Sequence, residues 1–117
     1  MDAPAHIEVY YASECTPCRL ELPVLARIAA DGTIPFSIVV LGDAREGLAQ
    51  LAAVSANLTV LARASNAWDM RKALREAGDK DAILPFARAL SAEGKLCGSW
   101  RGVLTQERMA RLLALCK

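Results

Sequence analysis

Two stretches of β-forming residues, separated by a helical pattern, constrain the fold of this chain most strongly. Residues His6–Ala12 (HIEVYYA) are rich in β-branched and aromatic side chains, which is typical of a strand. From about Thr16, apolar residues recur at helical spacing until Asp31-Gly32. A near-continuous apolar run at Phe36–Leu41 then predicts a strand buried on both faces. Together they predict a βαβ unit, with parallel strands and a right-handed crossover.

Helices and a short strand are expected after this unit. The pattern predicts a helix over Ala44–Ala56 and a strand over Asn57–Ala62. A second helix is expected to begin at Asn66, as its cap, and to end near Ala77, before Gly78.

The last third of the chain predicts a hairpin and a helix. The stretch PFARALSAEGKLCGSWRG contains two strand-like runs around a tight turn at Ala92-Glu93-Gly94. An amphipathic helix is expected at Thr105–Cys116, with Thr105 as a candidate cap. No repeat or linker interrupts this order, so residues 1–117 are predicted to form a single α/β domain.

Composition argues against several classes of function. The chain has 14 Lys and Arg and 13 Asp and Glu, a net charge of +1, which gives no basic surface for nucleic acid. No apolar run approaches the ~20 residues of a membrane span. No signal peptide is recognisable at the start, and we interpret MDAPAH as the front of a mature domain whose export signal has been removed.

Two cysteines, Cys15 and Cys18, lie where the first strand leads into the first helix. Unpaired N–H groups and the helix dipole favour negative charge there, so a thiolate at Cys15 is stabilised and becomes the attacking species. Cys18 lies one turn further on the same face and can close a small disulfide with Cys15. Pro17 fixes φ inside the loop and prepares helix entry. A CxxC at this junction indicates redox chemistry.

A metal site and an inert structural disulfide are the alternatives. A structural zinc site commonly takes four ligands in two pairs, and Cys97 and Cys116 are too far apart in sequence to form a second CxxC. The single histidine, His6, lies at the far end of the first strand. We therefore expect no metal and no cofactor, whereas a static CxxC stays open.

Two motifs resemble the thioredoxin superfamily, and within it the TlpA/ResA-type thiol–disulfide oxidoreductases. CTPCRLELPVL is similar to the family's CxPC, followed by a basic residue, a Glu and a helix-kinking proline. ILPFARALSAEGKLCGSWRG resembles its cis-proline, hairpin and trailing-glycine segment. The resemblance covers nearly the whole chain. It implies a thioredoxin fold: a central mixed β-sheet flanked by helices, with an αβ insertion and a further helix between the βαβ unit and the hairpin.

The resemblance implies roles for three residues of the first motif. Cys15 matches the exposed nucleophile that attacks a substrate disulfide, and Cys18 matches the buried thiol that resolves the mixed disulfide. Glu21 matches the acidic residue near that thiol. Three residues after Cys18, it can share a helix face with the thiol and take its proton. Without the resemblance, a solvated surface glutamate is the favoured interpretation.

The resemblance also implies a substrate-binding surface. Pro85 matches the cis-proline that faces the cysteine pair, and the backbone of Leu84 is expected to pair with the substrate chain. Thr16 and Pro17, between the cysteines, are expected to contact substrate and tune the redox potential. Glu14 departs from the family, which usually has an aromatic residue there, and its carboxylate disfavours the neighbouring thiolate.

Cys97 and Cys116 are candidates for a second, structural disulfide. The last strand and the last helix are of similar length, roughly 17–20 Å. If the helix folds back over the strand, the two cysteines meet and fasten the C-terminus. Two independent thiols are the alternative. A structural disulfide argues for an oxidising compartment such as the bacterial periplasm.

These observations lead to one functional hypothesis and two alternatives. We expect a monomeric reductase of protein disulfides that draws electrons from an upstream redox partner, in cytochrome c maturation or another export-side pathway. A redox-inert thioredoxin-fold binding module is the first alternative. An oxidase or isomerase is the second, and it differs from the reductase in redox potential.

Overall fold

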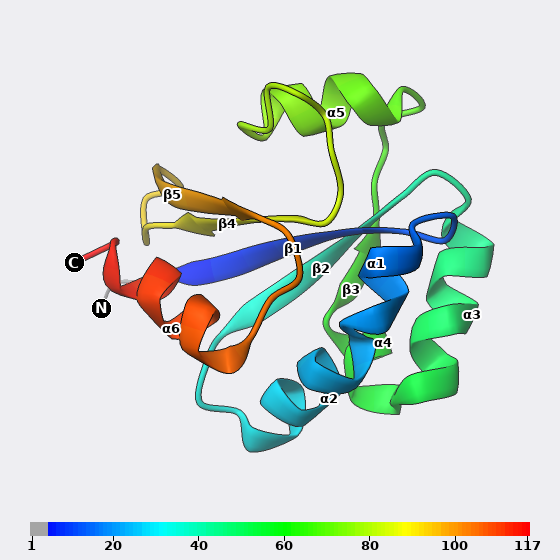
Figure 1. The fold of residues 1–117 in the computed structure, drawn as a ribbon, viewed down its shortest axis with the longest axis horizontal. Coiled ribbons are helices and arrows are strands. Elements are labelled where there is room, and N and C mark those ends of the chain that lie inside the picture. Colours follow the sequence, from blue (N-terminus) through cyan, green and yellow to red (C-terminus); the bar gives the residue numbers. More distant parts are fainter. Residues whose placement is uncertain (1–4) are drawn as a thin grey trace.

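The computed structural model describes residues 5–117, so most of the MDAPAH stretch lies outside it. Strands and helices alternate through the chain (Figure 1). In chain order the elements are β1 His6–Ala12, α1 Thr16–Leu20, α2 Leu22–Asp31, β2 Phe36–Leu41, α3 Ala44–Val54, α4 Ala56–Val60, β3 Ala62–Ala64, α5 Met70–Glu76, β4 Phe86–Leu90, β5 Leu96–Arg101 and α6 Gln106–Ala114. Strands β1 and β2 have the predicted bounds.

The five strands form one mixed sheet in the order β3-β2-β1-β4-β5. β1 pairs parallel with β2, and β2 pairs parallel with β3. β4 runs antiparallel to both β1 and β5, so the predicted hairpin is present. The mixed sheet flanked by helices confirms the expected fold class. β1 lies at the centre of the sheet, and the chain that leaves its carboxyl end carries the CxxC.

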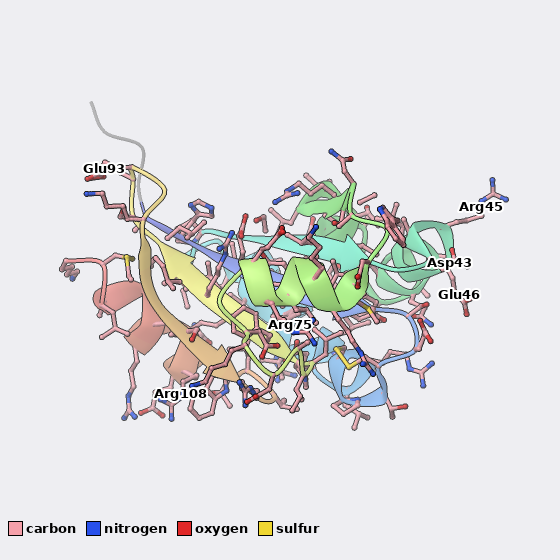
Figure 2. The ribbon with its side chains drawn as sticks, turned by 90° about the horizontal axis from the view of Figure 1, so that it is seen from above. Asp43, Arg45, Glu46, Arg75, Glu93 and Arg108 are labelled. Carbon is pink, nitrogen blue, oxygen red and sulfur yellow. A yellow bond between two sulfur atoms is a disulfide. The ribbon has the colours of Figure 1, made fainter. Side chains whose placement is uncertain are left out.

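The alternating side chains of β1 divide the core into two layers. Ile7, Val9 and Tyr11 are buried against α2, α3, α4 and α6, which cover one face of the sheet (Figure 1). Tyr10 points to the other face, where it packs with Leu74 of α5. Seen from above, α5 lies across the strands of this second face (Figure 2).

The strand predicted at Asn57–Ala62 is wrong. Most of that segment forms α4, and the edge strand β3 begins at Ala62. Ser55 caps α4, because its side chain accepts a hydrogen bond from the N–H of Asn57. The hydroxyl of Thr59 bonds back to the carbonyl of Ala56, so this β-branched residue is accommodated in a helical turn.

Two helix boundaries differ from the expectations, and the expected cap of a third helix is present. α5 begins at Met70 rather than near Asn66, because the Asp69 side chain accepts from the N–H of Lys72 and caps the helix there. α3 ends at Val54, two residues before the expected end. α6 begins after Thr105, whose hydroxyl accepts from the N–H of Arg108 in the predicted capping role.

Candidate redox site

Cys15 is the N-cap of α1, directly after the loop that follows β1. Its Sγ accepts a hydrogen bond from the N–H of Cys18 at 3.2 Å, and the two residues form a disulfide with Cα atoms 5.2 Å apart. Cys18 is fully buried, whereas Cys15 is half-buried. Cys15 is therefore the more exposed member of the pair, and the N–H that donates to its Sγ would also stabilise a thiolate.

Glu21 lies in the break between α1 and α2. Pro23 has no N–H to donate to Arg19, and the helix is interrupted here rather than continuing to Asp31 as one element. The Glu21 side chain is completely buried. The interpretation of Glu21 as a solvated surface residue is therefore wrong.

The Glu21 carboxylate has one hydrogen-bond donor within the described residues. The N–H of Leu104, just before α6, donates to Oε2 at 2.9 Å, while Oε1 has no partner within residues 5–117. Burial raises the pKa of Glu21 to about 7, and the Leu104 hydrogen bond opposes that rise. A carboxyl with this pKa can hold or accept a proton near neutral pH.

The segment before β4 lies beside the cysteine pair. The peptide bond between Leu84 and Pro85 is cis, the geometry that the resemblance implied. The carbonyl of Pro85 accepts from the N–H of Gly102, which ties this segment to the end of β5. Leu84 lines the same cavity as Cys15, so the structure brings together residues that are about seventy positions apart.

That cavity has a volume of about 510 Å³ and lies between α1 and α5. Thr16 and Pro17, both predicted to contact substrate, line its α1 side. Met70 and Arg71 line its α5 side, and sequence reasoning missed both because nothing in the local pattern places α5 opposite the CxxC. Cys15 therefore lines a groove whose two walls come from α1 and α5.

Arg101 fastens the loop that leads to Leu84. Its guanidinium pairs with Asp79 at 3.2 Å and with Asp81 at 3.0 Å. Asp79 is fully buried, so this ion pair joins the start of the loop to the end of β5. The sequence held no signal for this contact, since the partners lie on elements whose proximity is tertiary.

The second cysteine pair lies away from this groove. Cys97 in β5 and Cys116, after α6, form a disulfide with Cα atoms 5.0 Å apart. Gly98 permits the close packing there, because a Cβ at this position would lie 2.5 Å from Leu115. Neither cysteine lines the cavity that Cys15 lines.

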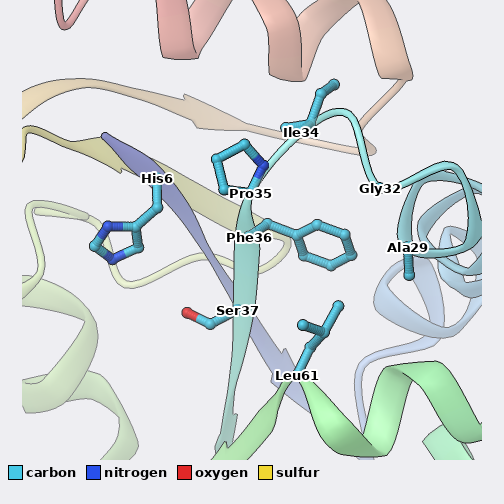
Figure 3. Close-up of a pocket in the computed structure, with 8 residues that line it drawn as sticks. All are labelled: His6, Ala29, Gly32, Ile34, Pro35, Phe36, Ser37 and Leu61. Atoms are coloured by element: carbon cyan, nitrogen blue, oxygen red, sulfur yellow. The ribbon is translucent and has the colours of Figure 1, made fainter. Parts of the chain in front are cut away.

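A separate cavity of about 410 Å³ lies at the opposite end of the parallel strands (Figure 3). His6, at the start of β1, is its one ionisable lining residue, and the rest of the lining is mostly apolar. His6 is thus remote from Cys15 and Cys18, which follow the other end of β1. Within residues 5–117, no three His, Cys, Asp or Glu side chains gather as a metal site would require.

No helix in the described part of the chain has the length and apolar character needed to cross a membrane.

Searches by sequence found no relative: no protein-family model matches the chain, and no curated protein matches it. Solved structures, in contrast, resemble it over nearly its whole length. A thioredoxin-related protein from Neisseria meningitidis serogroup B has a TM-score of 0.75 at 17% identity, covering 99% of this chain and 87% of that one.

Two further structures show the same likeness. The exposed lipoprotein thioredoxin of Streptococcus pneumoniae has a TM-score of 0.69 at 18% identity, over 97% of this chain and 85% of that one. A thio-disulfide isomerase from Thermus thermophilus has a TM-score of 0.64 at 22% identity, over 97% and 80%. At these identities the likeness establishes the fold, and the chain adopts the thioredoxin fold that its motifs implied.

Proposed function

We propose that this thioredoxin-fold chain is a thiol–disulfide oxidoreductase of the TlpA/ResA type that reduces disulfides in protein substrates. The observation that carries the proposal is the asymmetry of the Cys15–Cys18 pair. Cys15 is half-buried and lines a groove together with Leu84, which precedes the cis-proline, whereas Cys18 is buried in α1, which ends just before buried Glu21. A nucleophile needs access, and a resolving thiol needs protection and a proton acceptor.

The reaction begins from the reduced pair. The Cys15 thiolate attacks one sulfur of the substrate disulfide, forming a mixed disulfide and releasing the other substrate sulfur as a thiolate. Cys18 then loses its proton and attacks the Cys15 sulfur. The Cys15–Cys18 disulfide forms, and the second substrate sulfur leaves as a thiolate. The substrate gains two electrons, the protein loses two, and protons from Cys18 and solvent convert the substrate thiolates to thiols.

Glu21 serves as the proton acceptor for Cys18 in this scheme. The two residues are separated by less than one helical turn, and the N–H of Glu21 donates to the Cys18 carbonyl. The carboxyl has a pKa of about 7 because it is buried, so it accepts a proton at neutral pH directly or through water. The Oε1 atom of Glu21, which has no hydrogen-bond partner within residues 5–117, is the oxygen that would accept the proton.

Electron balance requires an upstream partner, because each turnover leaves Cys15 and Cys18 oxidised. We assign that role to a dithiol protein. The Cys97–Cys116 disulfide supports an oxidising, exported compartment such as the periplasm, where cytochrome c maturation is one pathway that needs such a reductase. The groove is complete within one chain, which supports action as a monomer.

The test is a redox titration in glutathione and dithiothreitol buffers, with alkylation and peptide mass spectrometry reporting each cysteine separately. A Cys15–Cys18 potential close to the value of about −270 mV for thioredoxin is expected of a reductase. A potential close to about −120 mV would reassign the protein to disulfide formation. Absence of reversible titration would overturn the enzyme proposal and leave a binding module with a static CxxC.

A further inference from the structure

The groove at Cys15 has walls of different charge. On the α1 side, Glu14 lines the cavity, and on the α5 side Arg71 lines it. Most of the other lining residues are apolar, among them Pro17, Met70 and Leu84. A polypeptide segment that enters this groove therefore meets apolar surface near the sulfur and one cation on the α5 wall.

Arg71 is available to such a segment. Its side chain is exposed, and it forms no ion pair with any residue of 5–117. Four other arginines form ion pairs within the protein, among them Arg88 with Glu8 and Arg101 with Asp79. Arg71 presents an uncompensated guanidinium whose planar fork matches a carboxylate.

Neighbouring cations on α5 do not share this placement. Lys72 lines a separate hollow with Trp68 and Glu76, on another side of the helix. Arg75, which Figure 2 labels on α5, does not line the Cys15 cavity. Among the residues that line the groove, Arg71 is thus the one cation, while Arg19 lies outside the lining and donates to the Thr16 hydroxyl at 3.2 Å.

We propose that Arg71 makes the groove selective for cysteine-containing segments that place an acidic side chain against the α5 wall. The preferred substrates are then disulfides of proteins whose reactive cysteine has an Asp or Glu within a few residues, and Glu14 disfavours the same charge on the opposite wall. This inference rests on the exchange activity proposed above. Arg71 determines specificity in it, while Cys15 performs the chemistry.

Five synthetic peptides test the selectivity. Each is an apolar peptide with one cysteine, joined to an identical copy by a disulfide. The first carries Gln two residues before and two residues after the cysteine, and the others replace one of those two Gln residues by Glu or Lys. The second-order rate constant for reduction of each peptide by the pre-reduced protein is measured in a single turnover, and it is divided by the rate constant with dithiothreitol to remove the peptide's own reactivity.

At one of the two positions, the wild-type protein is expected to prefer Glu over Lys by about two- to fivefold at low salt, the range of an exposed ion pair. The preference should shrink towards equality at high salt because the charges are solvent-exposed. Arg71→Gln is expected to abolish the preference and Arg71→Glu to invert it. Lys72→Glu changes the net charge equally on the same helix and is expected to leave the preference intact.

The outcomes separate the two proposals. A wild-type preference that survives Arg71→Glu, or that Lys72→Glu alters as much, overturns the selectivity while reduction continues. No preference at either position also overturns it. Failure of the wild-type protein to reduce even the Gln peptide overturns the exchange activity itself. Thermal unfolding of Arg71→Gln and Arg71→Glu verifies that both variants are folded.

Discussion

The two disulfides of this chain have nearly equal Cα separations, 5.2 Å and 5.0 Å, but different surroundings. Cys15–Cys18 closes a sequence separation of 3 within one strand–helix junction, beside a groove and the buried Glu21. Cys97–Cys116 closes a separation of 19 and joins a strand to the end of a helix. The first constrains little of the chain and includes the half-buried Cys15, and the second constrains a whole supersecondary unit.

We infer the role of each disulfide from the residues around it, because the two disulfides have nearly the same Cα separation. A local disulfide beside an acceptor carboxyl can open and close with little change elsewhere in the fold. A disulfide that spans β5 and α6 removes loop entropy from the unfolded chain and is suited to stabilisation. The predictions below test whether Cys15–Cys18 serves activity and Cys97–Cys116 serves stability.

The largest expected effect is on activity. Cys15→Ser should lower the reduction of insulin disulfides by several orders of magnitude, because the nucleophile is lost. The double variant Cys97→Ala/Cys116→Ala is expected to retain most of the activity at a temperature where it is folded. Turbidity of precipitating insulin chains measures both. Full activity of Cys15→Ser, or complete inactivity of the folded double variant, would contradict the assigned roles.

Stability should show the reverse ranking. Removing Cys97–Cys116 with two alanines should lower the free energy of unfolding by about 3 kcal/mol, as the chain-entropy relation gives for a loop of this length. Removing Cys15–Cys18 in the same way should cost about 2 kcal/mol, because its loop is shorter. Guanidinium unfolding without reductant measures the two. An equal or larger loss on removing Cys15–Cys18 would contradict the assignment of Cys97–Cys116 as the stabilising disulfide.

Glu21, which lies beside the first disulfide, should make the free energy of unfolding depend on pH. Its pKa is raised from 4.5 to about 7 by burial, so between these values the unfolded chain releases a proton that the folded protein retains. Wild-type stability therefore falls as pH rises through this window. Glu21→Gln removes the fall, and its gain over wild type should grow from near zero at pH 4 to about 3 kcal/mol at pH 8.

Glu8 supplies a matched control of opposite sign. Burial raises its pKa, but hydrogen bonds and the charge of Arg88, with help from Tyr10 and Arg63, outweigh burial and leave the pKa lowered. Glu8 thus contributes stability that is present above its unfolded pKa and is lost in acid. Urea unfolding across pH 3–8 should show Glu8→Gln most destabilised at the upper end. The same sign for both variants would refute the assignment of Glu21 as a desolvated acid.

The smallest expected effect concerns α6, which runs between the two regions. Thr105 caps this helix directly after Leu104, the donor to Glu21. Thr105→Ala should cost about 1 kcal/mol of stability through the lost cap, and Thr105→Ser should restore most of it. Hydrogen exchange of the Leu104 amide should accelerate in the Ala variant. Unchanged stability and exchange would show that the cap does not support the link between α6 and Glu21.

Local sequence determined the features that depend on short-range chemistry. Periodic side chains gave the bounds of β1 and β2, and a CxxC after the first strand indicated a redox pair at a helix start. The Thr105 cap and the interruption near Pro23 also follow from neighbouring residues. In each case the determining contacts lie within about one helical turn or one strand pair of the residue concerned.

The tertiary structure decided what depends on distant elements. The Asn57–Ala62 segment is mainly helix, and the edge strand begins only at Ala62, where the chain pairs with Ile38 of β2. Sequence reasoning proposed Glu21 as a functional acid by resemblance, but the hydrogen bond to its buried carboxylate comes from Leu104, 83 residues away. Arg71 lines the same cavity as Cys15 because α5 lies over the other face of the sheet, which no local pattern encodes. Burial, cavity walls and long-range pairs are properties of packing, so the sequence defined the chemical groups and the fold set their surroundings.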